Sequence, residues 1–141
     1  MKVTSLQKTP TSGADNDFDL ATGNLLAGLL VYSTTVPTGT SWTTSADKLK
    51  FLIDNVENMI ASMNWESLHG NLLSRLGYFG GIAAASGDDI IVKYGLIDFM
   101  PGGKDDFLVE TSGKSSVKLR ITAGDANIIR VLPIELAAQP E

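Results

Sequence analysis

Few residues in this chain could carry out acid–base or nucleophilic chemistry. His69 is the sole histidine, so any Ser-His-Asp arrangement would have to include it, and the sequence beside it does not resemble a nucleophile elbow. Structural zinc sites use four Cys or His ligands, whereas the chain offers one histidine and no cysteine. We therefore interpret His69 as a surface or capping residue and predict neither a catalytic triad nor a zinc site.

A second candidate for chemistry is the acidic segment near the N-terminus. Asp15, Asp17 and Asp19 alternate as the ligands of a calcium loop do. However, Leu20 stands where such a loop needs glycine, and no acidic residue follows at the twelfth position. We interpret the segment as an acidic, solvated loop.

Two acidic pairs and one glycine-rich motif are also explained by turns. Asp88-Asp89 and Asp105-Asp106 each lie next to glycine at the start of an apolar segment, where acidic turn residues are common. The GGK motif at 102–104 lacks the first glycine of a phosphate loop and the Ser or Thr after its lysine. None of the three predicts a catalytic or phosphate site.

The two tryptophans could bind a sugar, because the faces of aromatic rings suit pyranose rings. Trp65 ends an apolar run and is expected to pack in the core, whereas Trp42 lies among Thr and Ser and is expected to be exposed. A scaffold alone does not imply a function, so a lectin-like role stays open.

Composition excludes some classes of protein. The chain has 141 residues, a net charge of −5 and eleven scattered Lys and Arg residues, which argues against direct nucleic-acid binding. Its start lacks the apolar core of a signal peptide, and its longest apolar run is too short to cross a bilayer. Charged residues make up only 19% of the chain, which fits either an assembling subunit or a monomer with an apolar core.

The elements that must position these residues are mostly strands separated by Gly, Pro, Asn and Asp turns. We expect an N-terminal arm or edge strand at 1–24, a main domain at 25–136 and a C-terminal tail at 137–141. Alternation of apolar and charged residues at 117–122 indicates a strand with one buried face. Further strands are expected at 25–35, 90–99, 107–110 and 128–136, with Pro133 at a sheet edge.

The segment from 48 to 77 fits two folds. It can form a strand, a tight NVEN turn, a second strand and a short helix near 66–77. It also places apolar residues on one face of a single long helix at 45–64, for which Ser45 is a possible N-cap.

The order of these pieces resembles one jelly-roll domain of the coat proteins of tailless, membrane-containing icosahedral phages of the corticovirus and tectivirus type. LLVYSTTVPTG is similar to their strand that runs into a variable loop, and KLKFLIDNVENMIASMNWESLHGNLL to their hairpin followed by a short helix. IIVKYGLIDFMPGG resembles the next long strand, and SSVKLRITAGDANIIRVLPIEL the closing pair. Those proteins carry two jelly rolls, whereas 141 residues hold one, so the resemblance is to a single-jelly-roll version.

The resemblance implies an all-β fold, a single jelly roll of about eight strands with one short helix. It implies a structural capsid protein that self-assembles into an icosahedral shell, with no catalytic, cofactor-binding or metal-binding residues. The expected partners are further copies and other capsid proteins, with no direct nucleic acid and no small-molecule substrate, and a membrane beneath the shell is left open. The expected location is the virion after synthesis in the host cytoplasm, and the N-terminal arm and the 36–46 loop are the expected contact elements.

Two alternatives stay open. The same sandwich could be a carbohydrate-binding or receptor-binding module that uses Trp42. If 45–64 forms one helix, the chain is instead an α+β adaptor whose helix packs on the C-terminal strands.

Overall fold

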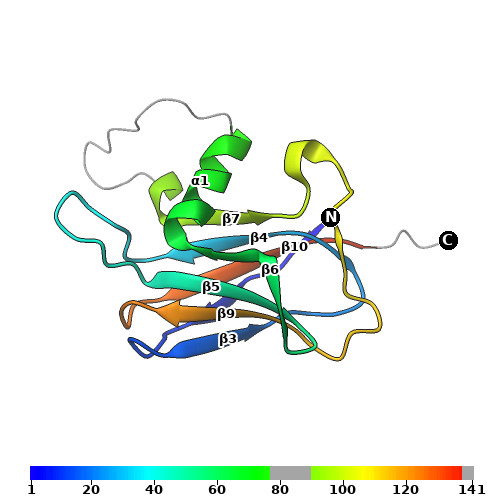
Figure 1. Cartoon of the computed structure of the whole chain (residues 1–141), viewed down its shortest axis with the longest axis horizontal. Coiled ribbons are helices and arrows are strands. Elements are labelled where there is room, and N and C mark those ends of the chain that lie inside the picture. The colour runs from blue at the N-terminus through cyan, green and yellow to red at the C-terminus, as the bar shows by residue number, and fades with distance from the viewer. Residues whose placement is uncertain (77–89, 138–141) are drawn as a thin grey trace.

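Strand pairing divides the chain between two antiparallel sheets (Figure 1). The computed structural model describes residues 1–76 and 90–137. One sheet has the order β1-β10-β4-β7, with β2 also paired to β10 and β8 to β4, and the other has the order β3-β9-β5-β6. The elements are β1 (Lys2–Val3), β2 (Leu6–Lys8), β3 (Asp15–Asp19), β4 (Leu25–Ser33), β5 (Ala46–Ile53), β6 (Val56–Asn64), α1 (Trp65–Leu76), η1 (Ile90–Lys93), β7 (Tyr94–Asp98), η2 (Pro101–Gly103), β8 (Val109–Glu110), β9 (Val117–Ala123) and β10 (Ile129–Leu136).

The topology is that of a jelly roll. β1 and β2 pair with neighbouring parts of β10, so together they act as one interrupted strand. With that strand counted once and the two-residue β8 set aside, eight strands remain in the described ranges. Their spatial order is first–eighth–third–sixth in one sheet and second–seventh–fourth–fifth in the other, which is a pair of interleaved Greek keys. The predicted all-β single jelly roll is confirmed.

Of the two alternatives expected for residues 1–24, an arm or an edge strand, the structure shows edge strands. β1 and β2 lie at the edge of one sheet, β3 lies at the edge of the other, and Phe18 is buried in the core. The strands of the sandwich therefore begin at Lys2, upstream of the boundary expected at Leu25. Sequence reasoning underestimated this segment because a strand with one apolar side chain facing inward carries little apolar signal.

Pro133 was expected at a sheet edge, and that expectation is wrong. β10 is an inner strand, flanked by β4 on one side and by β1 and β2 on the other. Pro133 pairs with Leu29 of β4, but on its other side it falls in the gap between β2, which ends its pairing at Val131, and β1, which begins at Ile134. A residue without an N–H is tolerated where a ladder is interrupted.

The contested segment is a hairpin, and the long helix at 45–64 is wrong. Leu49 and Phe51 are buried while Lys50 between them is exposed, which is the period of a strand. Asp54 and Asn55 have φ values of 50° and 64°, as both central residues of a type I′ turn require. The four-residue turn therefore runs from Ile53 to Val56 and begins two residues before the predicted NVEN.

α1 confirms the short helix expected after the hairpin and closes one side of the sandwich. It connects β6 to β7 and lies beside β7 in Figure 1. Trp65 and Leu68 are part of the hydrophobic core. Gly95 of β7 permits this packing, since a Cβ there would lie 2.6 Å from the Leu68 side chain.

The strand expected at 90–99 is shorter than predicted. Residues 90–93 form the 3₁₀ helix η1, and β7 begins at Tyr94. β-branched residues favour strands only where a partner strand is available, and the pairing of β4 with β7 ends at Tyr32 and Tyr94. No helix in the described ranges is long and apolar enough to span a membrane.

Candidate functional site

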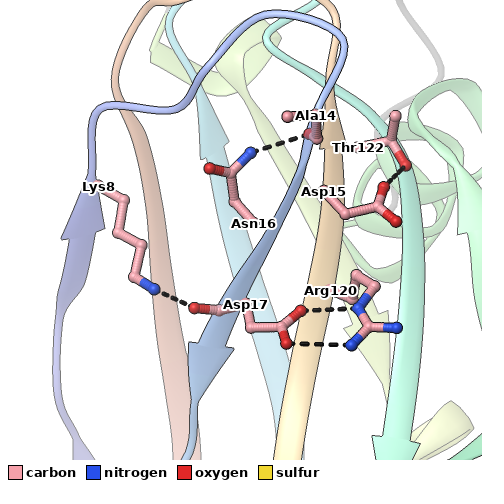
Figure 2. A network of polar contacts seen from close by, with 7 residues as sticks. All are labelled: Lys8, Ala14, Asp15, Asn16, Asp17, Arg120 and Thr122. Carbon is pink, nitrogen blue, oxygen red and sulfur yellow. Dashed lines mark hydrogen bonds and ion pairs between the residues drawn. The ribbon is translucent and has the colours of Figure 1, made fainter.

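The acidic segment at 15–19 is the strand β3, and the carboxylates of Asp15 and Asp17 accept hydrogen bonds from the neighbouring strand β9 (Figure 2). The register places three residues of β9 opposite Asp15, Asp17 and Asp19, namely Thr122, Arg120 and Lys118. Arg120 donates from Nε to Oδ1 of Asp17 at 2.7 Å and from Nη2 to Oδ2 at 3.1 Å. Thr122 donates to Asp15 at 2.7 Å, and Lys8 donates to the carbonyl oxygen of Asp17. The predicted loop is wrong, because alternation placed these side chains on one face of a strand.

We name the cross-strand contacts between Asp15–Asp19 and β9 the Asp15–Asp19 ladder. The pKa shifts of its charged groups agree with a structural role. The hydrogen bonds from Arg120 and its positive charge hold the pKa of Asp17 below the usual range, although partial burial opposes them. The same contact raises the pKa of Arg120. Within residues 1–76 and 90–137, no cluster of three or more His, Asp or Glu side chains is arranged to hold a metal ion.

His69 links the helix to the sheet. It lies half-buried on α1, and its Nδ1 donates to the carbonyl oxygen of Tyr94 at 2.7 Å. Its ring stacks on Trp65 with centroids 6.1 Å apart and an interplanar angle of 11°. The imidazole therefore positions α1 against β7.

The structure describes one of the two other acidic pairs and the GGK motif. Asp88 and Asp89 lie outside the described residues. Asp105 and Asp106 are exposed beside η2. Gly102 and Gly103 have φ values of 67° and 75°, which explains why this turn uses glycine.

An open polar cleft of about 640 Å³ lies between the C-terminal half of α1 and η2. Arg75 donates to the carbonyl oxygen of Met100 at 2.8 Å and forms an ion pair with Asp98 at 3.7 Å. Asp98 in turn accepts a hydrogen bond from the amide of Met100 at 2.8 Å. The charged groups of the cleft thus hold η2 in place.

Trp42 is the most exposed aromatic side chain of the described residues, at 83%. It belongs to the loop between β4 and β5, residues 34–45, which we name the Trp42 loop. Trp65, in contrast, is 2% exposed, so the expected difference between the two tryptophans is confirmed.

Buried hydroxyl groups fix the base of the Trp42 loop. Ser33, Thr44 and Ser45 are each at most 2% exposed. Ser33 Oγ donates to Thr35 O at 2.6 Å, accepts from the Ala46 amide at 3.1 Å and lies 3.2 Å from Thr44 Oγ1. These buried hydrogen bonds hold the base of the Trp42 loop in place.

The turn between β9 and β10 supports the same base. Burial alone would raise the pKa of Asp125, but hydrogen bonds from Thr35, Asn127 and Ser45 outweigh it and lower that pKa. Gly124 packs so closely that a Cβ would overlap the carbonyl oxygen of Thr44. A shallow hollow of about 320 Å³ lies beside the loop, lined by Trp42, Thr43, Thr44, Asp47 and Gly124.

A half-enclosed apolar hollow, which we name the apolar pocket, was missed by sequence reasoning. Its volume is about 240 Å³, and its lining residues are Ala61, Met63, Asn71, Ile97, Asp98, Phe99, Pro101 and Phe107. Phe107 is 58% exposed. The lining comes from β6, α1, β7, η2 and the segment after η2, so no local pattern marks it.

No family model matches the chain, and no curated protein matches it. Solved structures do. The major capsid protein (MCP) of STIV has 17% identity and a TM-score of 0.64 over 95% of this chain and 40% of its own. A chain of the atomic structure of Sulfolobus Turreted Icosahedral Virus has 16% identity and a TM-score of 0.61, over 94% and 36%. The major capsid protein P2 of bacteriophage PM2 has 13% identity and a TM-score of 0.62, over 96% and 44%.

These likenesses define the fold as a jelly roll of the kind found in viral major capsid proteins. The resemblance predicted from the order of the strands is thereby confirmed at the level of the fold. The chain spans less than half the length of each of these three capsid chains.

Proposed function

We propose that the chain is a structural subunit of an icosahedral viral shell that assembles with copies of itself and with other capsid proteins. The observation that carries the proposal is the superposition of nearly the whole chain on major capsid proteins of STIV and PM2. The polar side chains that could have supplied chemistry support it, because Asp17, His69 and Arg75 make structural contacts. The proposed subunit works without catalysis.

A closed symmetric shell is built from repeated copies of its subunits, which favours self-association of this chain. We infer a location in the virion after synthesis in the host cytoplasm. The net charge of −5 favours contact with proteins over direct contact with the genome.

Light scattering across a concentration series tests the proposal, with far-UV circular dichroism on the same samples. We expect trimers or larger species with a β-dominated spectrum, and particles by electron microscopy at the highest concentrations. A chain that stays monomeric at every concentration would contradict self-assembly.

A second candidate function is recognition of a glycan or receptor, which one observation favours. Trp42 is exposed beside a hollow that Thr43 and Asp47 also line, and an aromatic ring together with polar residues suits a sugar ring and its hydroxyl groups. Glycan-array binding that is lost in Trp42→Ala and retained in Trp42→Phe would support this function. The absence of binding by the wild-type chain would contradict it.

A further inference from the structure

Trp42 is a projecting apolar group on a rigid support. Its side chain is 83% exposed, yet Ser33 and Ser45 at the base of its loop are fully buried. An indole kept in water on an ordered loop loses little conformational entropy when it binds, because the loop is already fixed. Tryptophan is also strongly enriched among the residues that dominate binding energy at protein interfaces.

The apolar pocket has the size and lining to receive such a group. An apolar cavity of about 150 Å³ accommodates benzene, so a pocket of about 240 Å³ has room for the larger indole ring. Met63 and Phe107 offer sulfur and aromatic contacts to the ring. Asn71 and Asp98 carry side-chain oxygens at the same pocket that can accept the indole N–H.

The two features lie on different parts of the surface, so they cannot meet within one chain. In Figure 1 the Trp42 loop, drawn in cyan, forms the left end of the molecule. η2, drawn in yellow, contributes Pro101 to the pocket and lies on the other side of α1. A projection at one end and a matching pocket toward the other define a head-to-tail contact between copies.

We propose that Trp42 of one copy inserts into the apolar pocket of the next copy. The inference rests on the self-assembly proposed above and specifies the surfaces that carry it. Because the two surfaces differ, a pair of copies keeps one free projection and one free pocket, and copies add until a ring closes.

The expected area of contact limits what this insertion does. One buried tryptophan removes about 150–250 Å² from water, whereas a stable interface buries about 800 Å² on each partner. The insertion is therefore an anchor within a larger contact. Pairs are weak, and closure of a ring strengthens them because each added contact is intramolecular.

Sedimentation velocity of four purified chains tests the proposal. Trp42→Ala removes the projection, and Asn71→Phe fills the pocket from an exposed position of α1. Val56→Ala is the matched control, since Val56 is also an exposed apolar residue, at 70%, and does not line the pocket. We expect the first two changes to raise the dissociation constant at least tenfold and the control to leave it unchanged. Circular dichroism and thermal melts of the same samples check that all four chains are folded.

Mixing the two impaired variants gives the sharper result. Trp42→Ala still carries an open pocket and Asn71→Phe still carries the projection, so an equimolar mixture forms one productive contact. We expect dimers containing one of each variant and no larger species. Because this dimer cannot gain stability from ring closure, the mixture is measured at concentrations well above those at which the wild type assembles. A mixture that associates there no more than either variant alone would overturn the head-to-tail contact.

Fluorescence supplies a readout that loss of folding does not mimic. The chain has two tryptophans, and Trp65 is only 2% exposed within the single chain, so Trp42 is the tryptophan that acrylamide reaches. We expect acrylamide quenching to fall as wild-type chains associate and to stay constant for Asn71→Phe. If wild-type chains assemble with Trp42 still quenched, or Trp42→Ala assembles as the wild type does, the insertion is wrong and the shell function stands. If the wild type never associates, both proposals fail.

Discussion

The Asp15–Asp19 ladder and the Trp42 loop differ in what their polar groups leave available. In the ladder, charged side chains face one another across β3 and β9, and the carboxylate of Asp17 is held by two hydrogen bonds from Arg120. At the base of the Trp42 loop, the hydroxyl groups of Ser33 and Thr44 are bonded beneath the surface, while the large aromatic side chain of Trp42 is exposed to solvent. Judged by residue type alone, the Asp15–Asp19 segment looks more reactive than the Trp42 loop. Its carboxylates nevertheless already have hydrogen-bond partners within the fold.

The difference teaches where a partner can bind. A ligand of the ladder would have to break contacts that the fold already uses, at a cost in unpaired polar groups. A ligand of Trp42 would only remove apolar surface from water. We therefore place the interaction potential of this protein in its loops and assign the ladder to stability.

The largest expected effect tests whether the base of the Trp42 loop is rigid. Gly124→Ala places a Cβ against the carbonyl oxygen of Thr44, and a backbone atom cannot move aside as a side-chain end can. We expect a loss of about 2–3 kcal/mol in the free energy of unfolding, measured in urea. Gly39→Ala, within the Trp42 loop itself, is the control because no atom lies near its added Cβ. It should change the free energy of unfolding by less than about 0.5 kcal/mol. Equal losses in the free energy of unfolding for the two variants would show that the base of the Trp42 loop moves to make room for the added Cβ.

The next effect concerns the buried hydroxyl of Ser33. Ser33→Ala leaves the amide of Ala46 and the carbonyl of Thr35 without that partner inside the protein. Because the site is buried, we expect a loss of about 1–2 kcal/mol. Ser41→Ala, at an exposed hydroxyl of the same loop, should cost less than about 0.5 kcal/mol because water replaces the lost bonds. A neutral Ser33→Ala change would remove the distinction between base and tip.

Sequence reasoning predicted the sandwich well and its surfaces poorly, for physical reasons. Strand period and turn chemistry are local, so β9 and the hairpin of β5 and β6 could be predicted, although the hairpin competed with a helix of similar apolar spacing. β3 was missed because its one core side chain, Phe18, lies among polar residues that face solvent and β9. The exposure of Trp42 followed from its Ser and Thr neighbours. The apolar pocket could not be predicted, because Ala61 and Phe107 become neighbours only after folding.

A smaller effect is expected for the ladder. Asp17→Asn should cost about 0.5–1 kcal/mol near neutral pH, because the pair with Arg120 is partly exposed to solvent. The folded-state pKa of Asp17 is lowered, so its contribution is present above the unfolded pKa of about 3.9 and is lost as the pH falls through the lower folded value. Urea titrations from pH 7 to pH 2 should show wild type and variant converging at acid pH. A difference that persists or grows there would contradict the carboxylate pairing, and Asp19→Asn on the same strand serves as the control.

The smallest effect on the single chain is expected at Trp42, and it completes the comparison. Trp42→Ala removes a side chain that is 83% exposed, so the folded and unfolded chains lose nearly the same contact with water. At concentrations too low for association, we expect the free energy of unfolding to change by less than about 0.5 kcal/mol. A loss above about 1 kcal/mol would mean that the indole packs within its own chain and is not available to a neighbour. If Trp42→Ala leaves the free energy of unfolding unchanged and raises the dissociation constant for association, Trp42 joins copies of the chain without contributing to the stability of the fold.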